Sequence, residues 1–322
     1  MHGWIILDKP IGLGSTQAVA AVKRNLREAG IGKVKVGHGG TLDPLATGVL
    51  PIALGEATKL CGRMLDASKA YDFTIAFGTE TSGLDAEGEI VATSSHRPKL
   101  ADIEAVLPDF TGPIEQTPPA YSAIKVDGKR AYDRARAGED VEMKARHVTL
   151  HNLSVRHAEL ASASIVPNEP PIEVDRWTLK RVQGDGVLNS VTLSADVSKG
   201  TYIRSLARDI AKALGTVGHV SMLRRTRAGP FTLESAISLD KLNAFGQGHP
   251  QEDIILPMEA GLVDIPALDL SPEQARAVQA GRVLTGIAMK DGLHWARAAD
   301  LRPIALVENI GGVLKTVRGF NL

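Results

Sequence analysis

An apolar run over residues 4–7 opens the chain and predicts a first strand. Apolar side chains then recur every three or four positions over residues 15–29, with lysines and arginines on the opposite face. That spacing is typical of an amphipathic helix. We therefore expect a helix that is capped by Ser15 or Thr16 and ends at Gly30.

Residues 69–77 follow the two-residue period of a strand that buries one face. We expect the aromatic side chains of that face, from Tyr71 to Phe77, to point inward. Other strand-like runs cover residues 49–54, 120–126, 148–155, 172–179 and 187–197, and a helical pattern covers residues 202–214. This irregular mixture of strands and helices predicts the α+β class.

Residues 33–51 interrupt the pattern because they are rich in glycine and proline, and no regular helix or strand is expected there. This loop brings His38, Thr41 and Asp43 close together in sequence. Asp43 precedes Pro44, which favours extended backbone, so its carboxylate is expected to project from a stiff turn. A plain turn aspartate and an exposed carboxylate that acts as base, ligand or nucleophile both fit this pattern.

The composition changes near residue 246, where small, polar and then acidic residues are typical of a linker. We predict a large domain over residues 1–245, an acidic linker over 246–266 and a small, mostly β module over 267–322. The module contains a capping box that starts at Ser271, followed by short strand-like runs.

Charge is separated along the chain although 37 basic and 37 acidic side chains give no net charge. Residues 198–230 hold seven lysines and arginines and one aspartate, whereas residues 80–120 hold eight acids and two bases. A solvated face accounts for any one basic cluster, and an anion-binding surface requires the basic segments to converge. Since no apolar run approaches the roughly 18 residues of a membrane span, we expect a cytoplasmic protein without a membrane partner.

Several common chemistries lack their motifs: there is no Gly-rich phosphate loop, no dinucleotide fingerprint and no nucleophile elbow. His147 and His151 lie in a predicted strand, which places them about 13 Å apart, so a shared metal is not expected. Residues 85–89 are interpreted as an acidic, structural hairpin turn. Cys61 is the only cysteine, so it forms neither an internal disulfide nor a cysteine-rich zinc site.

Arg204 lies in the first turn of the helix predicted over residues 202–214. The helix dipole favours acids at that end, so a specific anionic partner would explain the arginine, and Asp43 is a candidate. An arginine exposed to solvent is the alternative.

Residues 35–51 read Lys-Val-Gly-His-Gly-Gly-Thr-Leu-Asp-Pro-Leu-Ala-Thr-Gly-Val-Leu-Pro and resemble the signature of the TruB family of tRNA pseudouridine synthases. The resemblance continues in order through residues 55–59, 69–71, 116–123, 199–204 and 219–225. Within the signature, the run from Leu45 to Pro51 resembles the stand-alone bacterial enzymes and not those of guide-RNA particles. The tail, residues 318–322, is similar to the small RNA-binding module, called PUA-like, of many members. A longer stretch near residues 161–186 and the acidic linker depart from the family pattern.

The resemblance implies a pseudouridine synthase fold, with a central mixed, mostly antiparallel sheet flanked by helices, and a C-terminal PUA-like module. It implies a catalytic domain that converts uridine to pseudouridine at position 55, in the T loop of tRNA, without metal or cofactor. The implied partner is the T stem-loop of tRNA. No guide RNA or obligate protein partner is expected, and the enzyme is expected to be a monomer.

The resemblance also assigns roles to single residues. Asp43 is implied as the nucleophile, at C6 of the base or C1′ of the ribose, and Arg204 as the partner that keeps it ionised. Tyr71 would stack on the target base and help to remove the C5 proton. The base must be flipped out of its loop, and His38 would fill or stack against the vacated space. The residues expected to bind substrate are His38, Lys9, Lys59, Tyr202, Leu223, Lys199, Arg224 and Arg225, with Leu223 lining the pocket and the lysines and the last two arginines contacting phosphates.

Two other classes of function remain open at this level. One is an RNA chaperone that folds tRNA with the same surface, with or without catalysis. A protein that acted only as a chaperone would have no use for Asp43. An Asp-dependent hydrolase of a small nucleoside would need neither the basic segments nor the C-terminal module.

Overall fold

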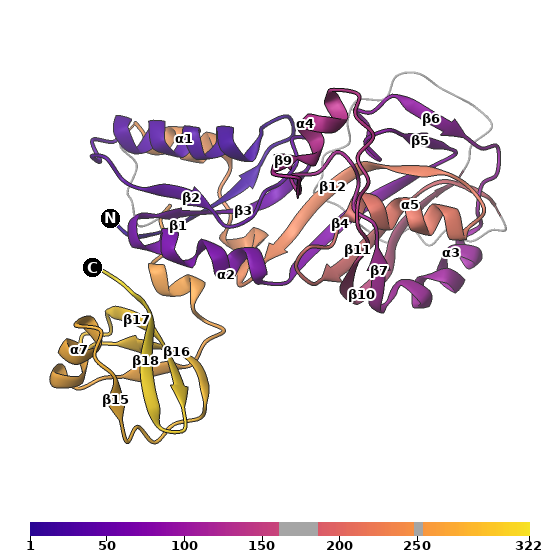
Figure 1. Ribbon diagram of the computed structural model, residues 1–322. Coiled ribbons are helices and arrows are strands. Elements are labelled where there is room, and N and C mark those ends of the chain that lie inside the picture. Colours follow the sequence, from indigo (N-terminus) through magenta and orange to yellow (C-terminus); the bar gives the residue numbers. More distant parts are fainter. Residues whose placement is uncertain (161–185, 248–253) are drawn as a thin grey trace. The chain divides into compact units, whose positions relative to one another are not determined.

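The computed structural model describes residues 1–160, 186–247 and 254–322 (Figure 1). The described chain forms two compact units, the first from Met1–Ala67 and Arg227–Leu322 and the second from Ser68–Thr226. Each unit contains helices and sheets, as predicted for the α+β class. Among the described residues, no helix is long and apolar enough to cross a membrane.

The N-terminal part of unit 1 is built on β3 (Thr47–Leu54), which pairs antiparallel with β1 (Gly3–Lys9) along one edge and with β2 (Val36–His38) along the other. The predicted helix is confirmed as α1 (Ser15–Glu28), whose buried residues include Ala18 and Val22. The remaining short elements of this part are η1 (Gly55–Leu60), α2 (Cys61–Asp66), β13 (Phe231–Thr232), η3 (Leu233–Ser235), α6 (Leu239–Phe245) and η5 (Met258–Gly261).

The C-terminal residues of unit 1 form a five-stranded sheet in the order β14-β16-β17-β18-β15. Helix α7 lies beside this sheet (Figure 1), and its predicted capping box, in which the Ser271 hydroxyl accepts from Gln274 N–H, is confirmed. The elements are β14 (Ala267–Asp269), α7 (Pro272–Gln279), β15 (Leu284–Thr285), β16 (Gly292–Arg297), β17 (Pro303–Ile310) and β18 (Val313–Gly319).

Unit 2 contains a twisted sheet in the order β12-β4-β11-β10-β7. The described pairings of β4 with β11, β11 with β10 and β10 with β7 are all antiparallel. The strands are β4 (Lys69–Phe77), β7 (Gly112–Gln116), β10 (Arg146–Leu160), β11 (Leu188–Val197) and β12 (Gly218–Ala228), whose last two residues belong to unit 1.

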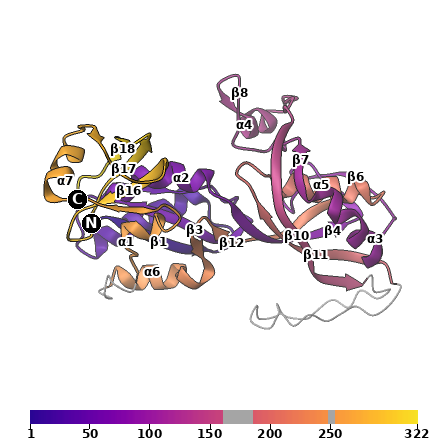
Figure 2. The ribbon, with the colours of Figure 1, turned by 90° about the horizontal axis from the view of Figure 1, so that it is seen from below.

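The core of unit 2 is formed where α5 (Ile203–Ala213) and α3 (Leu100–Val106) cover one face of the sheet. Phe73, Ile75 and Phe77 of β4 are buried there, so the predicted inward face is confirmed. The shorter elements of this unit are β5 (Thr79–Thr81), β6 (Ile90–Thr93), η2 (Leu107–Phe110), β8 (Lys125–Val126), β9 (Lys129–Arg130) and α4 (Ala131–Arg136). Figure 2 shows α4 and β8 at one end of β10, away from β11.

Three local predictions are wrong. Residues 33–51 are not wholly irregular, because β2 and the start of β3 lie within them and pair along the edge of β3. Gly14, and not Ser15 or Thr16, is the N-cap of α1. The strand predicted over residues 120–126 is mostly a turn with local backbone hydrogen bonds, and only its last two residues belong to β8.

Two further predictions concern the longer stretch near residues 161–186 and the predicted acidic linker. The strand predicted over residues 172–179, and most of the longer stretch near 161–186, lie outside the described residues. Within the predicted acidic linker, Met258, Leu262 and Ile265 are buried in an apolar cluster with Trp4. This packing explains why residues 254–265 belong to unit 1.

Candidate functional site

Asp43 lies in the turn between β2 and β3, half-buried, with its main-chain carbonyl accepting a hydrogen bond from Ala46 N–H at 3.1 Å. The neighbouring Leu42 is anchored from the start of α1. Its N–H donates to the Ser15 hydroxyl at 2.8 Å, and that hydroxyl donates to the Leu42 carbonyl at 2.9 Å. The residue expected to cap the helix therefore fixes the loop that carries Asp43.

Glycine is required at one point of this loop. A Cβ atom built on Gly39 would lie 2.6 Å from Cβ of Met64, which is closer than two non-bonded carbon atoms approach each other. The N–H of Gly39 donates to the Pro51 carbonyl at 2.8 Å. The loop thus passes tightly against α2 just before the carboxylate.

Lys9 is fully buried beneath the same loop. Its ammonium donates to the carbonyls of Pro10, Leu13 and Pro44 at 3.0, 2.7 and 3.2 Å. A phosphate cannot reach a lysine in this position, so the predicted phosphate contact of Lys9 is wrong. The charge instead ties the turn after β1 to the residue that follows Asp43.

Lys59 and His38 are the other predicted site residues of unit 1. The Lys59 ammonium lies 2.6 Å from a carboxylate oxygen of Glu56 and donates to the Gly319 carbonyl at 2.8 Å. A phosphate at Lys59 would therefore compete with two existing bonds. His38 is half-buried at the end of β2, and its Nδ1 accepts from Gly40 N–H at 3.4 Å.

In unit 2, Arg204 is 7% exposed in the first turn of α5. One terminal nitrogen donates to the Gly83 carbonyl at 2.8 Å and to the Asp85 carboxylate at 3.0 Å, and the other donates to the Tyr121 carbonyl at 2.9 Å. An arginine in a first turn needs an anionic partner, and Asp85 is one such partner. The pairing of Arg204 with Asp43 stays a prediction.

Asp85 belongs to the acidic turn that was interpreted as structural, and its contact with Arg204 was not predicted. A signal was present in the charge separation, since Asp85 lies in the acidic segment 80–120 and Arg204 in the basic segment 198–230. Their side chains are 18% and 8% exposed. At that burial an arginine and a carboxylate stabilise each other only when they are closely paired.

Tyr202 precedes α5 and is contacted by two residues that the sequence analysis did not assign. The Gln116 side chain accepts from Tyr202 N–H at 2.8 Å and donates to the Tyr202 carbonyl at 3.1 Å. The guanidinium carbon of Arg146 lies 4.7 Å from the centre of the Tyr202 ring. Nothing in the local sequence around Gln116 or Arg146 indicates these contacts, because they depend on the pairing of β7 with β10.

Tyr71 and Leu223 pack against the same apolar cluster of unit 2, from β4 and β12 respectively. The three remaining cations differ in exposure. Lys199 is exposed in the turn before α5, Arg224 is half-buried on β12, and Arg225 is 1% exposed. A phosphate can approach the first two side chains, whereas the phosphate contact predicted for Arg225 is wrong because that side chain lies inside the fold.

Cys61 and possible metal ligands were the other reactive groups considered from the sequence. Burial raises the pKa of the Cys61 thiol, although nearby Lys35 lowers it, so Cys61 stays protonated near neutral pH. In the described parts of the chain, no group of three or more His, Cys, Asp or Glu side chains could hold a metal ion.

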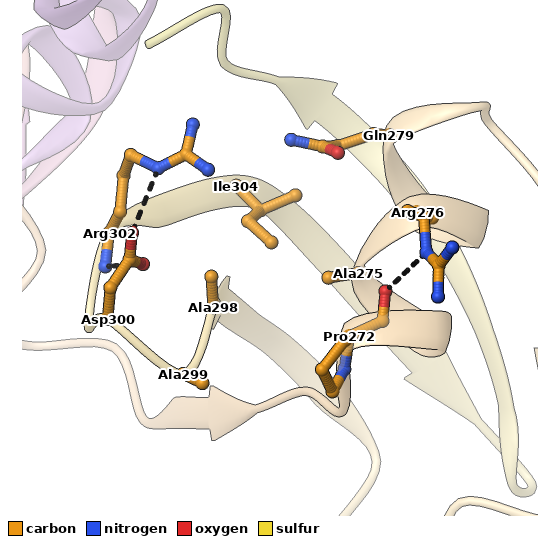
Figure 3. Close-up of a pocket in the computed structure, with 9 residues that line it drawn as sticks. All are labelled: Pro272, Ala275, Arg276, Gln279, Ala298, Ala299, Asp300, Arg302 and Ile304. Atoms are coloured by element: carbon orange, nitrogen blue, oxygen red, sulfur yellow. Dashed lines mark hydrogen bonds and ion pairs between the residues drawn. The ribbon is translucent and has the colours of Figure 1, made fainter.

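A hollow of about 410 Å³ lies in the C-terminal sheet between α7 and the β16–β17 turn (Figure 3). Arg276 and Arg302 stand on its two sides, and their guanidinium groups contact Pro272 and Asp300 respectively. None of the predicted site residues lines this hollow. The candidate site therefore does not coincide with it.

Two family models match the chain. They describe the TruB family pseudouridylate synthase N-terminal domain, over residues 24–166, and the tRNA pseudouridylate synthase B C-terminal domain, over residues 204–263. The tRNA pseudouridine synthase B of Novosphingobium aromaticivorans is 66% identical over 322 residues, which cover 100% of this chain and 98% of that protein. The protein of the same name from Zymomonas mobilis subsp. mobilis is 52% identical, over 100% of this chain and 96% of that protein.

Solved structures resemble the chain over nearly its full length. One is a chain of an H/ACA RNP bound to a substrate RNA containing 2′-deoxyuridine, with a TM-score of 0.67, 25% identity and coverage of 99% of this chain and 85% of that chain. Another comes from a Cbf5-Nop10-Gar1 complex, with a TM-score of 0.66, 27% identity and the same coverage of both chains.

Proposed function

The chain belongs to the TruB family of pseudouridine synthases, and on this premise we propose that Asp43 is the nucleophile with which it modifies uridine 55 in the T loop of tRNA. It is an enzyme that isomerises uridine in tRNA to pseudouridine, as its full-length relatives are named. The observation that carries the assignment of Asp43 is its position in a tightly anchored loop, which presents a half-buried carboxylate at a fixed place.

The reaction breaks the N-glycosidic bond and joins the same base to the ribose through C5. The Asp43 carboxylate adds to C6 of the base or to C1′ of the ribose, and this covalent step replaces one difficult step by two easier ones. The uracil then turns and C5 bonds to C1′. The bond between Asp43 and the carbon that it attacked breaks, the C5 proton leaves and N1 takes up a proton. Tyr71 stacks on the base and helps to remove that proton. No metal or cofactor takes part in the proposed sequence.

A nucleophilic carboxylate must be ionised and aimed, and Arg204 is proposed to do both. Its buried guanidinium is already held by two carbonyls and by Asp85, so it loses little freedom when it meets a substrate or a second carboxylate. Such a preorganised cation also stabilises negative charge that develops on the base.

The proposed partner is the T stem-loop of tRNA, with the target base extruded from its loop. His38 fills the vacated space, and Tyr202 and Leu223 line the pocket for the base. Lys199 and Arg224 supply the phosphate contacts, because both have exposed surface. The enzyme is proposed to act as a monomer in the cytoplasm, without guide RNA.

The assignment of Asp43 is tested by Asp43→Asn. The amide keeps the shape of the side chain but cannot act as the nucleophile, so we expect no pseudouridine in a T-stem-loop RNA and a dissociation constant within twofold of wild type. Asp109→Asn, on the exposed surface of η2, is the matched control and should retain full turnover. Substantial residual turnover in purified Asp43→Asn would remove Asp43 from this role.

A further inference from the structure

Tyr202, the residue directly before α5, is held by the side chain of Gln116. The two hydrogen bonds between the Gln116 side chain and the Tyr202 backbone measure 2.8 and 3.1 Å, and Gln116 is 2% exposed. Because one side chain bonds both the N–H and the carbonyl of the same residue, the backbone of Tyr202 cannot shift without breaking at least one of these bonds.

Arg146 covers the ring of the same tyrosine. Arg146 is the first residue of β10 and lies directly opposite Gln116 in the pairing of β10 with β7. Its guanidinium carbon is 4.7 Å from the ring centre, within the range of a cation–π contact. Gly200 lies beside this stack with a backbone φ of 82°, which favours glycine, and a Cβ built there would make an ordinary contact of 3.6 Å with a terminal nitrogen of Arg146.

The guanidinium has a free-energy cost in this position. Nε and one terminal nitrogen of Arg146 are buried and make no hydrogen bond within the part of the chain that the structure describes. A buried donor without an acceptor destabilises a fold, and an apolar side chain of similar length would avoid that penalty. Stability therefore does not account for an arginine here, whereas its contact with the Tyr202 ring does.

We propose that Gln116 and Arg146 are positioning residues that clamp Tyr202 in place for the pseudouridine reaction. This inference rests on the function proposed above, in which Tyr202 lines the pocket for the base. The clamp also bears on Arg204, which follows Tyr202 by two residues in the first turn of α5. Neither clamp residue needs to touch RNA, because each acts through the tyrosine.

Arg146→Met removes the charge and the planar stack while it retains apolar bulk. In single-turnover reactions at saturating T-stem-loop RNA we expect the rate constant to fall about tenfold, since small displacements in an active site have effects of this size or larger. The dissociation constant should stay within twofold, and the melting temperature should be unchanged or higher. Arg146→Lys, which restores the charge without the planar group, should recover only part of the rate.

The matched control is Arg297→Met. Arg297 lies 5.7 Å from the centre of the Trp295 ring in the C-terminal sheet, so the same substitution removes a stacked guanidinium away from the clamp. Its rate constant on the stem-loop should equal that of wild type.

A double-mutant cycle separates positioning from general support of the fold. In a Tyr202→Ala background, Arg146→Met should lower the rate no further, because the ring that it positions is absent. Full additivity would overturn the clamp. So would an unchanged rate in Arg146→Met alone, or a rate loss that accompanies a lower melting temperature and disappears on cooling.

Failure of the proposed function is distinguishable from failure of the clamp. If wild type does not modify the stem-loop, the proposed function fails, and the clamp is tested by fluorine NMR of protein labelled with 3-fluorotyrosine. The chain has four tyrosines, and Tyr202→Phe identifies the signal of Tyr202. Arg146→Met should shift that signal and leave the others in place. An unshifted Tyr202 signal would overturn the clamp.

Discussion

Lys9 and Arg204 are both almost fully buried, and the charged group of each donates hydrogen bonds to main-chain carbonyls. Lys9 holds the turn around Pro44, and Arg204 has the Asp85 carboxylate as well. Buried cations are stable in a fold only when such acceptors surround them. The two residues therefore act first on the geometry of their neighbours, whatever they contact during the reaction.

Asp85→Asn tests whether the carboxylate beside Arg204 supports catalysis. The amide can still accept one hydrogen bond but carries no charge, so we expect the free energy of unfolding to fall by about 1–3 kcal/mol. The single-turnover rate constant should fall on the order of tenfold, because the guanidinium of Arg204 is no longer held in its orientation by the carboxylate. Asp209→Asn alters another ion pair of α5, with Arg208 at 2.8 Å, and should leave the rate unchanged. An Asp85 variant with wild-type turnover would make this contact purely structural.

Salt dependence distinguishes Lys9, which is fully buried, from Lys199 and Arg224, whose side chains a phosphate can approach. Lys199→Ala and Arg224→Ala should each flatten the plot of log affinity against log salt by about 0.7, the expected contribution of one phosphate contact to single-stranded RNA. Lys9→Met should keep the wild-type slope and instead lower the free energy of unfolding by about 3 kcal/mol, since it leaves buried carbonyls without donors. A reduced slope in Lys9→Met would show that this lysine reaches phosphate after all.

The amino-acid sequence could single out Asp43 as the candidate nucleophile, but it could not indicate the side chains that contact Arg204 and Tyr202. Asp43 stands out because glycines and a proline surround it within a few positions. Asp85 and Gln116 reach Arg204 and Tyr202 across 119 and 86 residues of chain, so no local pattern indicates either contact. Lys9 was misassigned for a related reason, since a charge count cannot distinguish a buried lysine from an exposed one.

Among the elements, the loop between β2 and β3 depends on the first residue of α1. Ser15 is 5% exposed and exchanges two hydrogen bonds with the backbone of Leu42, one residue before Asp43. From the sequence alone, a serine at the start of a helix is expected to be its N-cap. In the structure the Ser15 hydroxyl bonds the loop instead, and Gly14 is the N-cap of α1. Strands with a clear two-residue period were predictable, whereas β2 was not, because its pairing to β3 does not depend on side-chain alternation.

Ser15→Ala should loosen this loop without disturbing α1, whose N-cap is Gly14. Two buried backbone groups of Leu42 lose their partner, so we expect the free energy of unfolding to fall by about 1–3 kcal/mol. The rate constant for pseudouridine formation should fall, and RNA affinity should hold. Thr16→Ala, one residue along on the exposed surface of the helix, is the control for helix propensity. Equal effects of the two substitutions would show that the loop does not depend on Ser15.

At the scale of the molecule, the last residues of the chain join the C-terminal sheet of unit 1 to η1. Lys59 donates to the Gly319 carbonyl, Asn321 N–H donates to Glu56 at 2.8 Å, and the Phe320 ring is buried. Burial acts to raise the pKa of Glu56, but the bonds from Lys59 and Asn321 outweigh it and lower the pKa below its usual value. The contact is therefore fully formed at neutral pH and weakens only as Glu56 becomes protonated in acid.

The predicted division of labour, with catalysis before residue 246 and added tRNA affinity after residue 266, can be tested by two truncations. Trp4 exchanges two backbone hydrogen bonds of 2.8 Å with Leu256, and its indole donates to the Met258 carbonyl at 3.1 Å. A chain of residues 1–245 lacks Leu256 and Met258, so Trp4 loses these contacts. Its exposure should reduce the free energy of unfolding by roughly 3 kcal/mol. A chain of residues 1–266 retains both residues.

We therefore expect residues 1–266 to fold and to modify a T-stem-loop, with weaker binding of full-length tRNA than the whole chain. Residues 1–245 should melt at a distinctly lower temperature, and their turnover should recover on cooling, because every residue proposed to act on the base lies within them. Circular dichroism melts, run beside pseudouridine mapping at two temperatures, separate lost stability from lost chemistry. If residues 1–266 are folded yet inactive at saturating stem-loop, the C-terminal sheet itself contributes to catalysis. Both truncated proteins lack that sheet, and they differ from each other only by residues 246–266.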